Sequence, residues 1–178
     1  MPLREIAGPA GRLEALLDEP ERGAGARAAV VFAHPHPQQG GTMHTKVVYQ
    51  AAKAFSRIGC AVLRFNFRGA GTSAGSFSDG PGEMDDLRAA LDFMCGRYPS
   101  APLWAGGMSF GSWIALSVGA ADPRVTTLIG LTSGTGERAR QLPRADPRRP
   151  RRTAGRPRHH LRRVVRWHRG RQVRGGGA

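Results

Sequence analysis

The sequence predicts one α/β domain in which helices cover both faces of a mostly parallel sheet. Between residues 27 and 131, short apolar runs that suit buried strands alternate with segments of helical periodicity. Turns rich in glycine and proline separate most of these segments. Strands that alternate with helices are typical of right-handed βαβ units, which bring parallel strands together in one sheet.

The first elements of this pattern lead to a loop with unusual chemistry. Two short segments flank the turn at 8–11 and are expected to form an antiparallel hairpin at the edge of the sheet. The apolar run at 27–33 predicts a strand that is covered on both faces. It ends in the loop 34–41, whose two prolines and two glycines cannot continue a strand or helix. Apolar residues at helical spacing predict a helix over 43–58, which Gly59 should end.

The remaining elements repeat the alternation. A second strand is expected over 60–67, followed by a loop rich in glycine and serine over 68–82. Acidic residues then crowd the start of a helix, where they complement the helix dipole: Glu83, Asp85 and Asp86. A strand over 103–107, a helix over 110–120 and a strand over 125–131 complete the predicted domain.

A GxSxG motif joins the third strand to its helix. Residues 107–111 read Gly-Met-Ser-Phe-Gly, in the strand, turn and helix context of a nucleophile elbow. The serine of such an elbow sits on a strained turn, and small residues two positions before and after it let strand and helix approach closely. Ser109 is therefore the candidate nucleophile, with Gly107 and Gly111 as the elbow glycines.

Two backbone N–H groups are candidates for an oxyanion hole. The N–H of Phe110, at the start of the helix, should point at the space above the serine where an oxyanion would develop. A second donor is expected from the loop after the first buried strand. Pro35 and Pro37 have no N–H, so we expect His36 to supply it.

Three motifs in this order resemble those of small bacterial α/β-hydrolases. They are His34-Pro35-His36-Pro37, the segment from Arg64 to Ser73, and residues 107–111. The groups that look most similar are the dienelactone-hydrolase-like and serine-aminopeptidase-like predicted hydrolases. The resemblance covers about residues 3–133. It implies a serine hydrolase that acts on a small-molecule ester, lactone or amide, with an acid and a histidine at the ends of two later strands.

The charge divides the chain into two unlike segments. The formal net charge is +14, but residues 1–136 hold 12 basic against 11 acidic residues, a net charge of +1. Residues 137–178 hold 15 arginines against Glu137 and Asp146, a net charge of +13. The sequence therefore predicts an incomplete α/β-hydrolase core over 1–136 and an arginine-rich, disordered tail over 137–178.

The composition of the tail indicates an unusual origin. It has no lysine and is dominated by arginine, glycine, proline and alanine, whose codons consist almost wholly of G and C. We hypothesise that the tail is an out-of-frame reading of a GC-rich gene. No apolar run of four residues occurs in it, so the last strands of the sheet are expected to be missing or disrupted. The strand over 125–131 would then be an exposed apolar edge.

The tail also bears on catalysis. Asp146 and then His159, His160 or His168 follow Ser109 in the order serine, acid, histidine. A triad, however, is recognised by its geometry, and no predicted strand holds these residues in place. We therefore expect this chain to be catalytically impaired.

Several other classes of protein are excluded or disfavoured. No apolar run reaches the roughly 18 residues that a membrane span needs, and the N-terminus lacks the pattern of a secretory signal. Cys60 and Cys95 lie inside apolar segments and suit a reducing compartment, so a cytoplasmic location is expected.

Neither a metal nor a cofactor is expected. His34, His36 and His44 lack a further ligand at a recognisable spacing. The GxGxxA pattern at 69–74 is not followed by the helix that a dinucleotide site requires.

An alternative function is a non-catalytic protein whose basic tail binds nucleic acid or other polyanions. The tail has one aromatic residue, Trp167, which is too few for a base-stacking platform, so this binding should be non-specific.

Arg68 is expected to anchor its loop, with a substrate carboxylate as its alternative partner. No chemistry is assigned to the serines on turns and helix faces, which are Ser73, Ser76, Ser78, Ser112 and Ser117.

Overall fold

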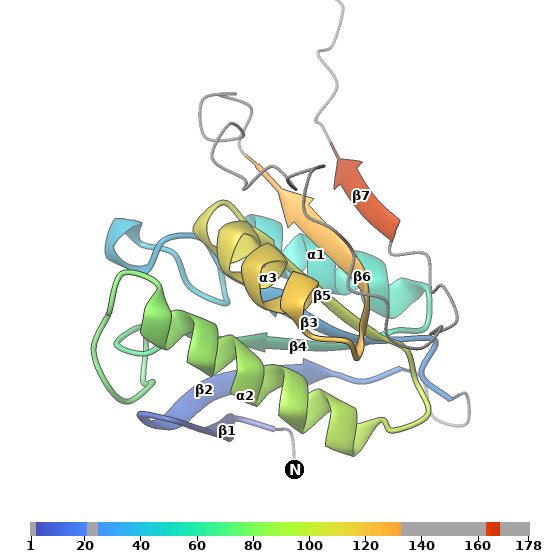
Figure 1. Cartoon of the computed structure of the whole chain (residues 1–178), viewed down its shortest axis with the longest axis horizontal. Coiled ribbons are helices and arrows are strands. Elements are labelled where there is room, and N and C mark those ends of the chain that lie inside the picture. The colour runs from blue at the N-terminus through green and yellow to red at the C-terminus, as the bar shows by residue number, and fades with distance from the viewer. Residues whose placement is uncertain (1–2, 21–24, 133–162, 168–178) are drawn as a thin grey trace, which may run out of the picture.

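The computed structural model describes residues 3–20, 25–132 and 163–167, the last as backbone alone. These residues form a seven-stranded sheet in the order β1-β2-β4-β3-β5-β6-β7 (Figure 1). The hairpin of β1 and β2 and the pairing of β2 with β4 are antiparallel, whereas all later pairs are parallel. The predicted fold class is therefore confirmed. The strands are β1 (Glu5–Gly8), β2 (Gly11–Asp18), β3 (Ala29–Ala33), β4 (Ala61–Phe65), β5 (Leu103–Met108), β6 (Val125–Leu131) and β7 (Arg163–Trp167).

Helices cover both faces of the sheet, as Figure 1 shows. Alternate residues of the buried strands point to opposite faces, so Val30 packs against α1, whereas Val31 belongs to the cluster under α2 and α3. Each α-helix contributes apolar residues to one of these two clusters, for example Val48 from α1 and Leu91 from α2. The helices are η1 (Pro37–Gln39), α1 (Lys46–Arg57), α2 (Pro81–Arg97) and α3 (Phe110–Ala121).

The register of the central strands brings three loops together. Gly107 near the end of β5 lies opposite Ala33 of β3 on one side and Gly130 of β6 on the other. The carboxyl ends of parallel strands share one edge, so the loops after β3, β4 and β5 all leave the sheet on the same side. This edge carries the GxSxG turn.

The structure corrects the sequence analysis at β7. This strand lies within the segment predicted to contain none, and it pairs with β6 in parallel, with Leu131 opposite Trp167. The prediction that β6 forms an exposed edge is therefore wrong. A search for four consecutive apolar residues misses β7 because Arg166 interrupts its apolar positions, although Val164 and Val165 have high strand propensity. The predicted disorder of the rest of the tail concerns residues outside the described ones.

None of the described helices combines the length and the apolar character that a membrane crossing requires.

Candidate active site

Ser109 occupies the sharp turn between β5 and α3. Its φ of 53° and ψ of −113° lie in a region that residues other than glycine rarely adopt, at a cost on the order of 1–3 kcal/mol. Hydrogen bonds hold the turn on both sides. The N–H of Ser109 donates to the carbonyl of Leu131 at 2.8 Å, and its own carbonyl accepts from Ser112 and Trp113 at 3.0 and 3.1 Å. The residue is exposed, so the turn presents an accessible hydroxyl.

The two elbow glycines lie where no side chain fits. A Cβ on Gly107 would meet the backbone of Gly111 at 2.4 Å. A Cβ on Gly111 would meet the carbonyl oxygens of His34 and Ala33 at 2.4 and 2.6 Å. The first glycine therefore allows α3 to approach β5, and the second allows α3 to approach the end of β3.

Ser112 stabilises this turn through hydrogen bonds of its side chain, a role that the sequence analysis did not assign. Its buried Oγ lies 2.6 Å from the carbonyl oxygen of Gly107 and 2.8 Å from that of Leu131, and it accepts the N–H of Leu131 at 3.0 Å. The hydroxyl has one hydrogen, so it donates to one carbonyl at a time. The only signal in the sequence is a hydroxyl near the start of a largely apolar helix.

The side chains of the two residues predicted to donate to an oxyanion pack against each other. The rings of His36 and Phe110 have centroids 5.0 Å apart, although their segments are far apart in the sequence. The carbonyl of His36 accepts the N–H groups of Gln39 and Gly41, which hold the loop in a tight turn. No acceptor among the described residues takes the N–H of His36 or that of Phe110. Neither N–H is therefore used within the described fold, as is common for N–H groups at helix starts, and their role as oxyanion donors stays a prediction.

His34 is a structural residue at the end of β3. Its Nε2 accepts the N–H of Phe67 at 3.0 Å, and its Nδ1 lies 2.6 Å from the carbonyl oxygen of Pro35. These partners assign the proton to Nδ1. Burial lowers the pKa of His34 from 6.5 to about 4, so the ring is neutral at pH 7. With both nitrogens engaged, His34 cannot take a proton from Ser109.

The other histidines named in the sequence analysis do not gather around His34. The ring of His36 packs between those of Phe77 and Phe110, with centroids 4.9 and 5.0 Å away, and its buried Nδ1 has no hydrogen-bond partner among the described residues. His44 is exposed. The described part of the chain holds no cluster of three potential metal ligands.

Arg68 anchors the loop after β4, as the sequence predicted. Its guanidinium forms a two-pronged ion pair with the fully buried carboxylate of Asp86, with an Nη2 to Oδ1 distance of 2.8 Å. The backbone N–H of Arg68 donates to the same carboxylate at 2.9 Å. Hydrogen bonding to Asp86 raises the pKa of Arg68. This arrangement leaves little of the guanidinium for the alternative partner, a substrate carboxylate.

The candidate acid and bases from the tail, Asp146, His159, His160 and His168, lie outside the described residues.

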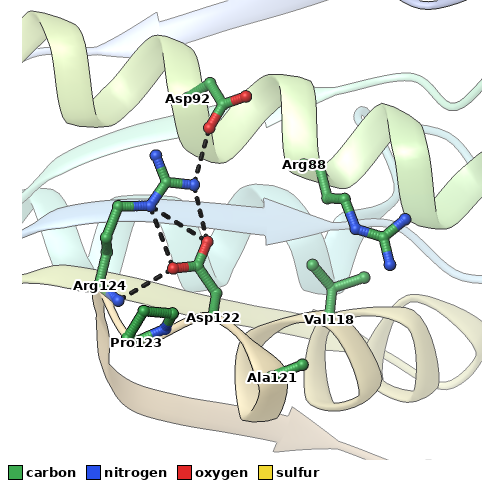
Figure 2. A pocket seen from close by; sticks show the side chains of 7 residues that line it. All are labelled: Arg88, Asp92, Val118, Ala121, Asp122, Pro123 and Arg124. Carbon is green, nitrogen blue, oxygen red and sulfur yellow. Dashed lines mark hydrogen bonds and ion pairs between the residues drawn. The ribbon is translucent and has the colours of Figure 1, made fainter.

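A hollow at the far end of α3 is unrelated to the elbow. Figure 2 shows Arg124 reaching between Asp92 and Asp122, with Nη2 2.7 Å from a carboxylate oxygen of each. These hydrogen bonds, above all those to Asp122, raise the pKa of Arg124. The hollow borders the last turn of α3, which begins at Phe110 and runs for 12 residues. It is therefore roughly 18 Å from the elbow, at 1.5 Å per residue.

Comparison with known proteins gives one family. The model of the family described as "Serine aminopeptidase, S33" matches residues 24–163. An uncharacterised protein of Rickettsia prowazekii is 39% identical over 133 residues, which are 74% of this chain and 55% of that protein.

Solved structures agree with this match. An α/β serine hydrolase without a lid from Xanthomonas campestris is 42% identical, with a TM-score of 0.67 over 73% of this chain and 59% of that one. An α/β serine hydrolase homologue from Coxiella burnetii is 40% identical, with a TM-score of 0.66 over 71% of this chain and 60% of that one. The chain thus spans less than two thirds of the length of each of these relatives.

Proposed function

Since this chain belongs to the serine aminopeptidase S33 family of α/β hydrolases, we propose that its fold serves acyl transfer to water with Ser109 as the nucleophile. The substrate would be a small-molecule ester, lactone or amide. Two relatives of known structure are described as an α/β serine hydrolase and an α/β serine hydrolase homologue, which supports hydrolysis as the general reaction.

The backbone of Ser109 is the observation that carries this proposal. A non-glycine residue at φ 53° persists only where its surroundings hold it there, and such strain is concentrated at functional sites. Here the strain lifts an exposed hydroxyl above the start of α3, between two glycines that leave no space for side chains.

The proposed reaction has two acyl-transfer steps. A base removes the proton of the Ser109 hydroxyl, Oγ attacks the carbonyl carbon, and the N–H groups of Phe110 and His36 stabilise the oxyanion. The leaving group then departs with that proton, which gives an acyl-enzyme. Water attacks the acyl-enzyme by the same route, releases the acid and restores the hydroxyl.

We further propose that this chain performs the reaction poorly because it has no positioned base among the described residues. Both nitrogens of His34 are engaged, and no predicted strand holds Asp146 or the histidines of the tail in place. Loss of triad members costs about 10⁴ to 10⁶ in turnover, and the oxyanion hole and substrate binding leave roughly 10³ to 10⁴ over water.

Labelling with a fluorophosphonate tests both parts of the proposal. We expect slow labelling that Ser109→Ala abolishes and that Ser117→Ala, an exposed serine on the same helix, leaves unchanged. Added imidazole should accelerate the labelling because it supplies a base. Labelling that persists in Ser109→Ala would contradict the nucleophile, and fast labelling that imidazole does not change would contradict the missing base.

The tail supports a second proposed function. With 15 arginines against two acidic residues, it should bind nucleic acid and other polyanions through phosphate contacts alone. Competition between DNA duplexes of unrelated sequence tests this, because equal affinities are expected. A preference for one sequence would contradict it.

A further inference from the structure

A surface hollow lies beside the elbow, between the loops that follow β3 and β4. Both loops leave the carboxyl edge of the parallel strands, on the left in Figure 1. The hollow has a volume of about 310 Å³. An enclosed apolar cavity of roughly 150 Å³ can hold benzene, so the volume of this hollow is sufficient for a substituted aryl ring. Its lining residues are Pro37, Gln38, Gly69, Gly75, Ser76 and Phe77.

Aromatic rings connect this hollow to Ser109. Phe77, which lines the hollow, has its ring centroid 5.8 Å from that of Phe110, the residue directly after the serine. His36 contacts both rings, and Trp113 lies 5.6 Å from Phe110 and is 42% exposed. We call these four residues the aromatic wall. Rings at 4.5–7 Å interact favourably in tilted or edge-to-face arrangements, so the wall suits a further ring from a substrate.

None of the described residues that line the hollow is charged, and two carboxylates of α2 already have partners within the fold. Asp86 engages Arg68, and Glu83 accepts hydrogen bonds from Ser78 and from the N–H of Gly80. A substrate carboxylate or ammonium group would therefore lose water in this hollow without gaining a counter-ion from its lining. The family description names an aminopeptidase, whose substrate carries an ammonium group, but the described lining of this hollow offers no carboxylate to hold it.

We propose that the hollow binds an uncharged aryl group of the substrate and that Phe77 is a specificity-determining residue. The substrate class is then a neutral ester that carries an aryl group. This inference rests on the proposed function, since it assigns the hollow to the substrate of Ser109.

Ligand binding to the full-length Ser109→Ala variant tests the inference without turnover. Fluorine NMR titration would compare neutral methyl 4-fluorophenylacetate with the anion 4-fluorophenylacetate and the cation 4-fluorobenzylamine. The neutral ester should bind about tenfold more tightly than either charged ligand, because a charge desolvated without a partner weakens binding. The amine also tests whether Asp79, an exposed carboxylate two residues after Phe77, serves as a counter-ion for a bound cation.

Two further substitutions in this variant locate the binding. Phe77→Leu should weaken binding of the neutral ester about five- to tenfold through loss of a ring contact. Ser76→Trp starts from an exposed position and should block the hollow while keeping Phe77. Tyr49→Leu is the matched control, because Tyr49 is an exposed aromatic residue on α1 outside the hollow and the wall.

The outcomes separate this inference from the proposed function. Equal affinity for charged and neutral ligands, or binding that survives both Phe77→Leu and Ser76→Trp, would overturn it. Aryl binding in a protein that shows no Ser109-dependent labelling would remove the proposed function but leave the aryl site. Labelling at Ser109 without a preference for the neutral aryl ligand would overturn the aryl site alone.

Discussion

Ser112 ties the nucleophile turn to the last residue of β6, Leu131. The Oγ of Ser112 accepts the N–H of Leu131 at 3.0 Å, and the carbonyl of Leu131 accepts the N–H of Ser109 at 2.8 Å. The three residues therefore form one hydrogen-bonded unit. Through it, the end of β6 helps to hold Ser109 in its strained conformation.

Ser112→Ala should destabilise the protein and disturb the elbow. The partly buried N–H of Leu131 would lose its acceptor, which costs about 1–3 kcal/mol of unfolding free energy. Ser117→Ala on the exposed face of α3 should change it by less than about 0.5 kcal/mol. Denaturant unfolding measures both values. Equal stability of the two variants would show that the Ser112 hydroxyl does not support the turn.

Gly111→Ala should be far more damaging than Gly96→Ala. The new methyl of Gly111→Ala would lie 2.4 Å from the carbonyl oxygen of His34, so α3 must shift at a cost of about 1–3 kcal/mol or more. Gly96 lies in α2 with no atom within 4 Å of an added Cβ, and alanine there should stabilise the helix by about 0.5–1 kcal/mol. Thermal unfolding of the two variants compares them, and a shift in the same direction for both would contradict the close packing of the elbow.

The depressed pKa of His34 predicts a loss of stability in acid. The unfolded chain takes up a proton near pH 6.5, but the folded chain does so only near pH 4. The contribution of His34 is therefore complete above pH 6.5 and is lost as the pH falls toward 4. At pH 5 the loss amounts to about 2 kcal/mol relative to pH 7.

His34→Gln checks this assignment. Glutamine can still accept the N–H of Phe67 but does not titrate, so the difference in unfolding free energy between pH 7 and pH 5 should shrink by about 2 kcal/mol in this variant. An unchanged difference would mean that another group causes the acid sensitivity.

Breaking the Arg68–Asp86 pair should lower the unfolding free energy more than breaking an exposed ion pair on α2, the helix that carries Asp86. Arg68→Met leaves the buried carboxylate of Asp86 without its counter-ion, a loss of about 3 kcal/mol or more. Arg88→Met breaks a pair with Asp85 in which both side chains are more than half exposed and should cost less than about 0.5 kcal/mol. Urea titration measures the unfolding free energy of both variants. Similar losses would show that Arg68 is not a structural anchor of its loop.

The gene sequence tests the hypothesis about the tail. Beyond the codon for Leu131, another reading frame should encode strands of hydrolase type together with an acid and a histidine. A chain expressed in that frame should label with fluorophosphonate at least about 10⁴-fold faster. Conventional codon usage through the present tail, with no such sequence in the other frames, would refute the hypothesis.

Local sequence patterns predicted most of the described elements. The strand over 125–131 has the predicted bounds, and α3 begins at Phe110 as expected. The helix predicted over 43–58 begins only at Lys46, because Thr45 has a non-helical backbone, and the N–H of Met43 donates to the side chain of Asn66, a residue distant in the sequence. β7 was missed for a related reason, since pairing with β6 does not require a continuous apolar run.

The sequence by itself determined the turn that carries Ser109. The two glycines lie within five residues of sequence, between a predicted strand and a predicted helix. Over so short a segment, backbone sterics decide the conformation. Only the tertiary structure decided what surrounds this serine. The strand order places β3 between β4 and β5, and this brings His36 and Phe77 to Phe110 and leaves the hollow between their loops. Such contacts depend on sheet pairing between distant segments, and the hydrophobic periodicity within each segment does not specify that pairing.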